Sequence, residues 1–265
     1  MLGIRDLTIK YSTPGGEIEA LSSVSIEIER GATLALVGES GSGKSTVALS
    51  AMGILPSEAR IANGQIVFDG KDLMSLTPSE RRDIRGTRMA MVFQDPFSVL
   101  NPSLPIGDQV SEVLVYKMGF TKSLAEKRAI ELLSEVGIRN PKEIAQSYPH
   151  QLSGGMRQRA VIAGALASNP ELLILDEPTT ALDVTIEAQI LDMLERLREQ
   201  HKLTMLFISH NLGVVKRIAN KCAVLYAGQI IEEGRTSDIL LEPFHPYTKG
   251  LIAAIPKLGE KKKQL

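Results

Sequence analysis

The chain has 265 residues, of which 43% are hydrophobic, and this is enough for one large domain or two closely joined domains rather than a disordered protein. Its 30 Lys and Arg offset 31 Asp and Glu, so a formal charge of -1 excludes a general electrostatic attraction to nucleic acid or to an anionic membrane. The single cysteine, Cys222, excludes an internal disulfide and a multi-cysteine metal site, so we expect no iron–sulfur cluster. We expect membrane attachment only through a partner, because no apolar run reaches the roughly 18 residues that span a bilayer.

Strands dominate the predicted structure of the N-terminal part. Residues 2–9 alternate between apolar and polar with an interruption, residues 24–28 alternate cleanly, and residues 34–37 form a short apolar run. A Pro-Gly-Gly sequence at 14–16 indicates a turn, and residues 45–54 are predicted to form a helix. The order is therefore strand, glycine-rich loop, helix.

Further strand-like runs follow, most of them between helical stretches, which favours an α/β core. They are residues 65–68, 89–93, 172–175, 203–208 and 222–226. The segment 105–168 differs, because its apolar spacing is mostly helical and includes an amphipathic helix that ends at Gly137. We interpret it as a helical subdomain inserted into the sheet domain, and the charged residues 259–265 as a frayed end.

The glycine-rich stretch matches the phosphate-loop pattern G-x-x-x-x-G-K-[ST] at every fixed position. Glycines let backbone N–H groups turn toward phosphates, and the helix that follows adds its positive dipole end. We expect Lys44 to reach the β- and γ-phosphates of ATP and Ser45 to bind Mg²⁺; an ordinary glycine-rich turn is the alternative. The nucleotide-binding residues predicted here are Gly38, Ser40, Gly41, Ser42, Gly43, Lys44, Ser45 and Thr46.

Two adjacent carboxylates, Asp176 and Glu177, end the apolar run at 172–175. Neighbouring side chains along a strand point in opposite directions, so the two carboxylates are expected to act differently. We assign Asp176 to Mg²⁺ and Glu177 to the water that attacks the γ-phosphate. A solvated strand end is the alternative, and the phosphate loop in the same chain argues against it.

Residues 152–159, Leu-Ser-Gly-Gly-Met-Arg-Gln-Arg, contain a second anion-binding pattern at a helix start. This string resembles the signature of ATP-binding-cassette (ABC) proteins, and the likeness extends over nearly the whole chain. It implies that Ser153, Gly154 and Gly155 contact the nucleotide held by the phosphate loop of a second cassette. Ser153 is also expected to cap the helix 153–168, an explanation that leaves the two glycines without a role.

The same resemblance implies roles for four other positions. Gln94 is similar to the family glutamine that senses Mg²⁺ and the attacking water, and His210 to the histidine that contacts the γ-phosphate, although a lone histidine after a strand is more often structural. Residues 181–183 resemble the loop that touches the opposite cassette. Tyr11 lies where the family has an aromatic ring that stacks on adenine, with core packing as the alternative.

The fold class that this resemblance implies is α/β, a P-loop NTPase core with an N-terminal antiparallel β-subdomain and an inserted α-helical subdomain. The core is assigned to residues 1–100 and 169–240, the helical subdomain with the signature to 101–168, and a C-terminal extension to 241–265.

Strings at residues 94–102, 147–151 and 245–248 resemble the motor subunits of dipeptide, oligopeptide and nickel importers. Many such proteins continue into a cysteine-bearing segment with an iron–sulfur cluster. This sequence has no cysteine there, so it is interpreted either as a shorter type of motor or as a chain whose tail was removed. The implied partners are a second ABC ATPase subunit, identical or different, two integral membrane permease subunits and, indirectly, an extracellular solute-binding protein. The implied location is the cytoplasmic face of the cell membrane, with no nucleic acid involved.

Other functions remain open from the sequence alone. A nickel or other solute importer, an exporter motor, and a cassette acting in DNA repair or translation share the same motifs. The last usually carries a coiled-coil insertion, zinc-binding cysteines or two cassettes in one chain, and a regulatory subunit without turnover usually loses the residues equivalent to Glu177 or His210.

Overall fold

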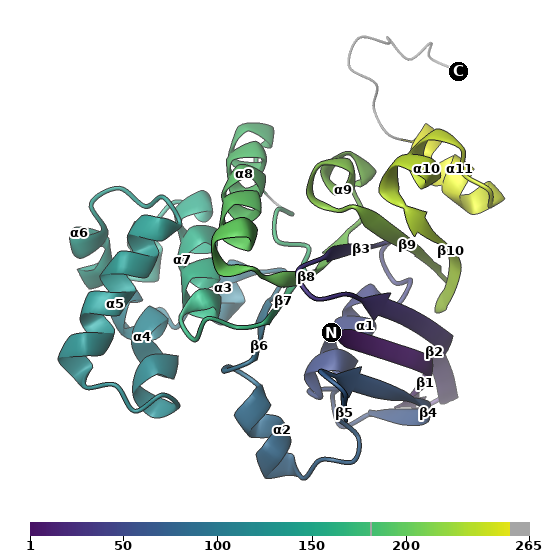
Figure 1. The fold of residues 1–265 in the computed structure, drawn as a ribbon, viewed down its shortest axis with the longest axis horizontal. Helices are drawn as coiled ribbons and strands as arrows, with labels where there is room; N and C mark the ends of the chain where they lie inside the picture. The colour runs from purple at the N-terminus through teal and green to yellow at the C-terminus, as the bar shows by residue number, and fades with distance from the viewer. Residues whose placement is uncertain (181, 255–265) are drawn as a thin grey trace.

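The structure is a computed structural model that describes residues 1–180 and 182–254. Its strands form two sheets (Figure 1), one with four strands in the order β2-β1-β4-β5 and one with six in the order β10-β9-β3-β8-β7-β6. The helices that connect the strands are distributed around the larger sheet, and one group of helices lies to the side of β6 and β7. This arrangement is the predicted α/β core with an antiparallel β-subdomain and a helical part.

The antiparallel sheet begins as a long hairpin with its turn at the predicted position, residues 14–16. Its strands are β1 (Leu2–Thr13), β2 (Gly16–Ile28), β4 (Ala59–Phe68) and β5 (Lys71–Asp72). The interrupted alternation of β1 has a structural cause, since Asp6 has a φ of 48° and the register with β2 shifts between Ile4 and Leu7. This irregularity keeps both Ile4 and Leu7 buried although they are three residues apart.

The larger sheet is parallel except at one edge. Its strands are β3 (Thr33–Val37), β6 (Met89–Val92), β7 (Leu172–Asp176), β8 (Thr204–Ser209), β9 (Lys221–Tyr226) and β10 (Gln229–Arg235). Only β10 is antiparallel to its neighbour, β9. Every residue of β3, β7 and β8 is buried, as expected for central parallel strands covered on both faces, and the ends of these strands are where α/β folds place ligands.

The helices connect and cover these strands. They are α1 (Lys44–Met52), α2 (Pro78–Ile84), α3 (Pro96–Val99), α4 (Ile106–Tyr116), α5 (Lys122–Glu135), α6 (Pro141–Gln146), the 3₁₀ helix η1 (Pro149–Gln151), α7 (Gly154–Leu166), α8 (Val184–His201), α9 (Leu212–Ile218), α10 (Thr236–Leu241) and α11 (Pro246–Ala253). Helices α4 to α7 pack on one another beside the sheet, and α5 ends as predicted with Gly137 in the left-handed conformation.

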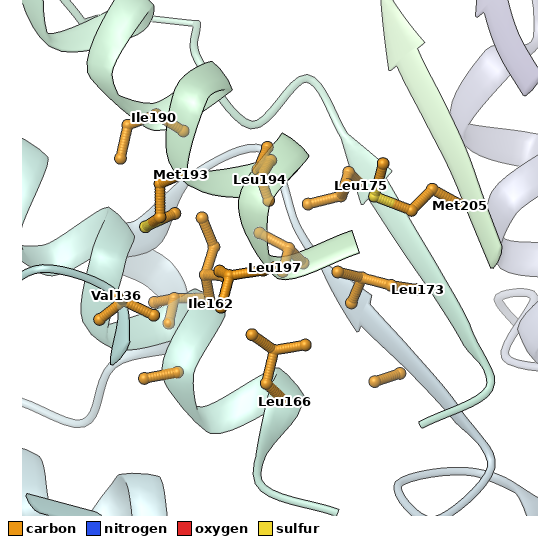
Figure 2. Close-up of a cluster of buried hydrophobic side chains, with 14 of the residues drawn as sticks. Val136, Ile162, Leu166, Leu173, Leu175, Ile190, Met193, Leu194, Leu197 and Met205 are labelled. Carbon is orange, nitrogen blue, oxygen red and sulfur yellow. The ribbon is translucent and has the colours of Figure 1, made fainter. Parts of the chain in front are cut away.

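Two apolar cores hold the layers together. One lies between the antiparallel sheet, α1 and one face of the larger sheet. The other lies on the opposite face (Figure 2), where Ile162 and Leu166 of α7 and Met193 and Leu194 of α8 gather beside Leu173 of β7. The second core therefore attaches the helix that carries the signature to the strand that ends in the acidic pair.

Several elements differ from the predicted bounds. Strand β4 starts at Ala59, six residues before the predicted run, because residues 59–64 are half-buried or exposed and show no apolar alternation. Strand β10 and helix α8 were not predicted as separate elements. The three domain ranges remain predictions. Residues 259–265, predicted as a frayed end, lie outside the described residues. Within the described chain, no helix is both long and apolar enough to span a bilayer.

Candidate active site

The phosphate-loop pattern occupies the connection from β3 to α1 and begins at the carboxyl end of β3. Two of its glycines are required by close packing. A Cβ atom on Gly38 would lie 2.2 Å from the Leu225 carbonyl oxygen, and one on Gly43, whose φ is 107°, would lie 2.7 Å from Leu21 Cδ2. The loop therefore passes so near β9 and β2 that side chains at these positions are excluded.

Lys44 lies inside this loop and is only 5% exposed. Its Nζ donates hydrogen bonds to the carbonyl oxygens of Gly38 at 2.9 Å and Glu39 at 2.7 Å, and lies 3.8 Å from Glu177 Oε1. Burial lowers the pKa of Lys44, and the nearby carboxylates, Glu177 first, oppose that shift. The Ser42 hydroxyl is also buried and has no hydrogen-bond partner within the described residues, which leaves it able to donate to a phosphate.

Asp176 and Ser45 lie together as the sequence predicts. The Asp176 side chain is hydrogen-bonded to Ser45, yet its Oδ1 is buried without a partner among the described residues. Burial raises the pKa of Asp176, and the Ser45 hydrogen bond and the Lys44 charge oppose that rise. A hydroxyl beside a carboxylate oxygen that lacks a partner fits Mg²⁺, which prefers oxygen ligands and usually binds one or two carboxylates.

Glu177 is the centre of a cluster of polar side chains from three different connections. Its Oε2 atom accepts hydrogen bonds from Gln94 Nε2 at 3.2 Å and Thr180 Oγ1 at 3.0 Å, and lies 3.1 Å from His210 Nδ1. The carboxylate is only 12% exposed, whereas the His210 side chain is 55% exposed. The predicted catalytic residues Gln94, Glu177 and His210 are thus brought together although 83 and 33 positions separate the outer two from Glu177.

The backbone explains how Asp176 and Glu177 reach different partners. Glu177 lies beyond the end of β7 with a φ of 47°, an uncommon value for a residue with a side chain, and its N–H donates to the Ile208 carbonyl at 3.0 Å. The divergence of the two carboxylates therefore comes from this left-handed residue rather than from strand alternation alone. Such strain at a polar cluster is typical of functional sites.

Thr180 was missed by the sequence analysis. The turn Glu177-Pro178-Thr179-Thr180 returns the chain so that the Thr180 N–H donates to the Glu177 carbonyl at 3.2 Å, and the hydroxyl then reaches the Glu177 carboxylate. A proline at the second position of a four-residue turn is the signal that could have identified it.

The signature lies at the start of α7. Ser153 is the N-cap, and its Oγ accepts from the Met156 N–H at 3.3 Å, so the predicted capping is present. Gly155 packs closely on α8, since a Cβ atom there would lie 2.7 Å from Ile186 Cγ2, and Gly154 faces Leu182. Ser153 itself is exposed, and the nucleotide-contacting role of Ser153, Gly154 and Gly155 stays a prediction.

The structure tests the predictions for the loop 181–183 and for Tyr11 only in part. The loop 181–183 includes Ala181, which lies outside the described residues, while Asp183 caps α8 by accepting from the Ile186 N–H at 3.0 Å. Tyr11 is half-buried, packs on the apolar core of the antiparallel sheet, and its hydroxyl lies 3.4 Å from Thr46 Oγ1. The structure thus places Tyr11 beside the phosphate loop, and its stacking on adenine stays a prediction.

Comparison with known proteins adds independent findings. The model of the ABC transporter family matches residues 21–180, and that of the oligopeptide/dipeptide transporter C-terminal region matches residues 231–265. The oligopeptide transport ATP-binding protein OppD of Bacillus subtilis is 48% identical, over 97% of this chain and 72% of its own. The dipeptide transport ATP-binding protein DppD of Lactococcus lactis is also 48% identical, over 97% of this chain and 74% of its own.

Solved structures of the same kind share the fold. The ATP-binding cassette MJ0796, in a dimeric post-hydrolysis state bound to ADP and Pi, superposes with a TM-score of 0.80 at 29% identity, covering 89% of this chain and 99% of its own. The protein cbiO1 of Clostridium perfringens, part of the ABC transporter complex cbiONQ, superposes with a TM-score of 0.77 at 29% identity, covering 91% of this chain and 90% of its own.

The fold, the phosphate loop and the polar cluster at Glu177 define a nucleotide-hydrolysing α/β protein. The chain belongs to the ABC transporter family, as an ATP-binding subunit that hydrolyses ATP. Its relatives among ABC subunits include proteins named for oligopeptide and dipeptide transport.

Proposed function

We propose that this chain hydrolyses ATP to energise the import of dipeptides and oligopeptides. The observation that supports this best is the convergence of Gln94, Thr180 and His210 on one oxygen of Glu177, next to Lys44 of the phosphate loop. The names of the relatives and the match of residues 231–265 to the oligopeptide/dipeptide C-terminal region support the class of solute.

In this proposal Glu177 orients and deprotonates the attacking water. Its Oε2 is held by three neighbours, which sets the direction of the carboxylate before substrate arrives. For His210 to donate to an ionised Glu177 carboxylate, its Nδ1 must carry a proton. His210 is exposed enough to contact a γ-phosphate at the surface of the cassette.

Mg²⁺ would be held by Ser45 and Asp176, with Gln94 nearby, and would neutralise charge on the β- and γ-phosphates. Lys44 must then turn from the carbonyls of Gly38 and Glu39 toward the phosphates, a change that exchanges two neutral acceptors for an anion. Tyr11 would lie against the adenine.

A second cassette, identical or related, would supply the signature contact. The exposed Ser153 and the N–H groups at the start of α7 would face the phosphate loop of that partner, so that ATP binds between the two. Closure and reopening of the pair would power alternating access, and the chain would work at the cytoplasmic face of the membrane.

Each of the two membrane permease subunits would dock on one cassette of the pair, in a groove between the strand that leads to Gln94 and the helices α4 and α7. Its lining includes Phe93, Val99, Tyr116 and Val161, and the Tyr116 side chain is 82% exposed. An extracellular binding protein would deliver the solute to those subunits without touching this chain.

The central test is Glu177→Gln, which keeps the size of the side chain and removes its basicity. We expect ATP binding to persist, turnover to fall by about 10²- to 10⁴-fold, and a closed dimer to accumulate, because a general base contributes about that much to rate. Glu199→Gln, the same change at a side chain that is 76% exposed on α8, should leave turnover unchanged. Normal turnover in Glu177→Gln would remove Glu177 from the catalytic role.

The solute is tested in the assembled transporter. Peptide-loaded binding protein should stimulate ATP hydrolysis by the complex of this chain with its membrane subunits, and a nickel chelate should not. Stimulation by the nickel chelate alone would redirect the proposal to the nickel branch of the same subfamily.

A further inference from the structure

The helix α11 near the C-terminus contacts the phosphate loop directly. The Tyr247 hydroxyl accepts a hydrogen bond at 3.0 Å from the backbone N–H of Glu39, the second residue of the phosphate-loop pattern. The two residues are 208 positions apart. Burial raises the pKa of Tyr247, which keeps this hydroxyl neutral over the ordinary pH range.

A second contact holds the same loop from the turn between β9 and β10. The Gly228 N–H donates to the Ser42 carbonyl at 3.0 Å, and its own carbonyl accepts from the Ser22 N–H at 2.9 Å. Tyr226, two residues before Gly228, contacts the Tyr247 ring with centroids 4.3 Å apart. The turn and α11 therefore form one unit, joined through Tyr226 and Tyr247.

The start of α11 is itself anchored to β10. Both carboxylate oxygens of Glu232 are used, accepting from the Phe244 N–H at 2.7 Å and the His245 N–H at 3.1 Å. His245 in turn accepts from the Tyr247 N–H at 3.1 Å, and Thr248 is completely buried. These contacts fix the backbone that carries the Tyr247 ring, so the position of its hydroxyl is well determined.

The peptide group between Gly38 and Glu39 is held on both sides, because Tyr247 accepts from its N–H and Lys44 donates to its carbonyl. If Lys44 turns to the phosphates of ATP, the carbonyl loses that restraint and Tyr247 keeps its hold on the same peptide. A restraint that is kept in the bound loop favours binding by reducing the ordering that the ligand must impose.

We propose that Tyr247 is a positioning residue for nucleotide binding, which holds the Glu39 peptide of the phosphate loop in place through its hydroxyl. This inference rests on the proposed function, because it takes the phosphate loop as the ATP site. It assigns a role to the His245-Pro246-Tyr247-Thr248 string, which lies in the region matched to the oligopeptide/dipeptide C-terminal model.

The test uses the full chain with Tyr247→Phe, which removes the hydroxyl and keeps the ring against Tyr226. Tyr226→Phe is the matched control, since it removes a hydroxyl from the other ring of the same pair. We expect Tyr247→Phe to weaken MgATP binding by about two- to tenfold, the effect of losing one ordinary hydrogen bond, and to raise KM for ATP with kcat within about twofold. Tyr226→Phe should bind MgATP as the unaltered chain does.

Hydrogen exchange of the peptide covering residues 38–43 gives a readout without nucleotide. In Tyr247→Phe this peptide should exchange faster than in the unaltered chain, and saturating MgATP should restore its protection. Glu232→Ala should produce the same faster exchange, and adding Tyr247→Phe to it should weaken binding little further, because both changes release the same contact.

Lys44→Ala separates failure of this inference from failure of the proposed function. If Lys44→Ala loses MgATP binding while Tyr247→Phe keeps both the affinity and the loop exchange of the unaltered chain, the positioning role is wrong and the ATP site stands. If Lys44→Ala binds MgATP normally, the phosphate loop is not the nucleotide site and both proposals fail. A loss of kcat in Tyr247→Phe with unchanged KM would also overturn the positioning role.

Discussion

The phosphate loop and the signature are built on the same local plan but have different surroundings. Each places glycines, a hydroxyl and backbone N–H groups at the start of a helix, α1 or α7. The loop before α1 is closed in by β2, β9 and α11, and Lys44 is buried, whereas Ser153 at α7 is exposed. The first region is organised within one chain, and the second presents a surface suited to a partner.

The largest effect is expected at the organised region. Lys44→Ala should weaken MgATP binding to the isolated chain by about 100-fold or more, because hydrogen bonds to charged groups contribute about 1.5–3 kcal/mol each and Lys44 is expected to make more than one. Titration with a fluorescent ATP analogue measures this. Lys216→Ala, at an exposed position on α9, is the control and should bind normally.

The signature should behave in the opposite way. Ser153→Ala should leave MgATP binding to the isolated chain within about twofold but lower turnover of the assembled pair by about 10- to 100-fold, the effect of one lost hydrogen bond to a charged group. It also removes a helix cap, so Thr121→Ala, which removes the cap of α5, controls for that loss. Equal loss of binding in the isolated Ser153→Ala chain would break the comparison.

A smaller effect tests the residue that only the structure identified. Thr180→Val should lower kcat by about three- to tenfold without changing MgATP affinity, because one of the three contacts that orient Glu177 Oε2 is lost and two remain. Steady-state hydrolysis by the assembled transporter separates kcat from KM. Thr87→Val removes a hydroxyl that hydrogen-bonds to carbonyls of α2 and should leave kcat unchanged.

The smallest effect is expected at a surface ion-pair cluster, which sets the scale for changes outside both regions. Hydrogen bonds from Arg88, then from Arg30, lower the pKa of the Glu171 carboxyl below its ordinary range. A carboxyl whose pKa is lower in the folded state than in the unfolded chain stabilises the folded state at pH values above the pKa of the unfolded chain. This contribution is lost as pH falls through the pKa of the folded state.

Glu171→Gln should therefore lower the free energy of unfolding at pH 7 by at most about 1 kcal/mol, because exposed ion pairs contribute little. The difference from the unaltered chain should shrink as pH falls from 5 toward 3, which urea unfolding at several pH values measures. A constant difference over that range would assign the effect of the substitution to packing.

Short motifs identified most of the candidate site. The phosphate loop, the acidic pair and the signature each depend on local backbone geometry, so glycines, a strand end and a helix cap could be recognised from a few consecutive residues. Periodicity likewise predicted the buried strands β3, β6, β7, β8 and β9, since a parallel core requires continuous apolar runs.

Elements without an apolar pattern were harder to predict. Residues 59–64 form the first half of β4 because β1 offers a pairing edge, although their side chains are half-buried or exposed. Strand β10 is also mostly half-exposed, and it was recognised only through its antiparallel pairing with β9.

The phosphate loop, the acidic pair and the signature could each be recognised from consecutive residues, because each is a chemical pattern within about eight residues. Which distant groups meet became visible only in the folded chain: Thr180, Gln94 and His210 lie at Glu177, and Tyr247 lies at the Glu39 N–H. These contacts depend on the order of strands in the sheet and on the left-handed backbone at Glu177, and they arise when the sheet packs as a whole.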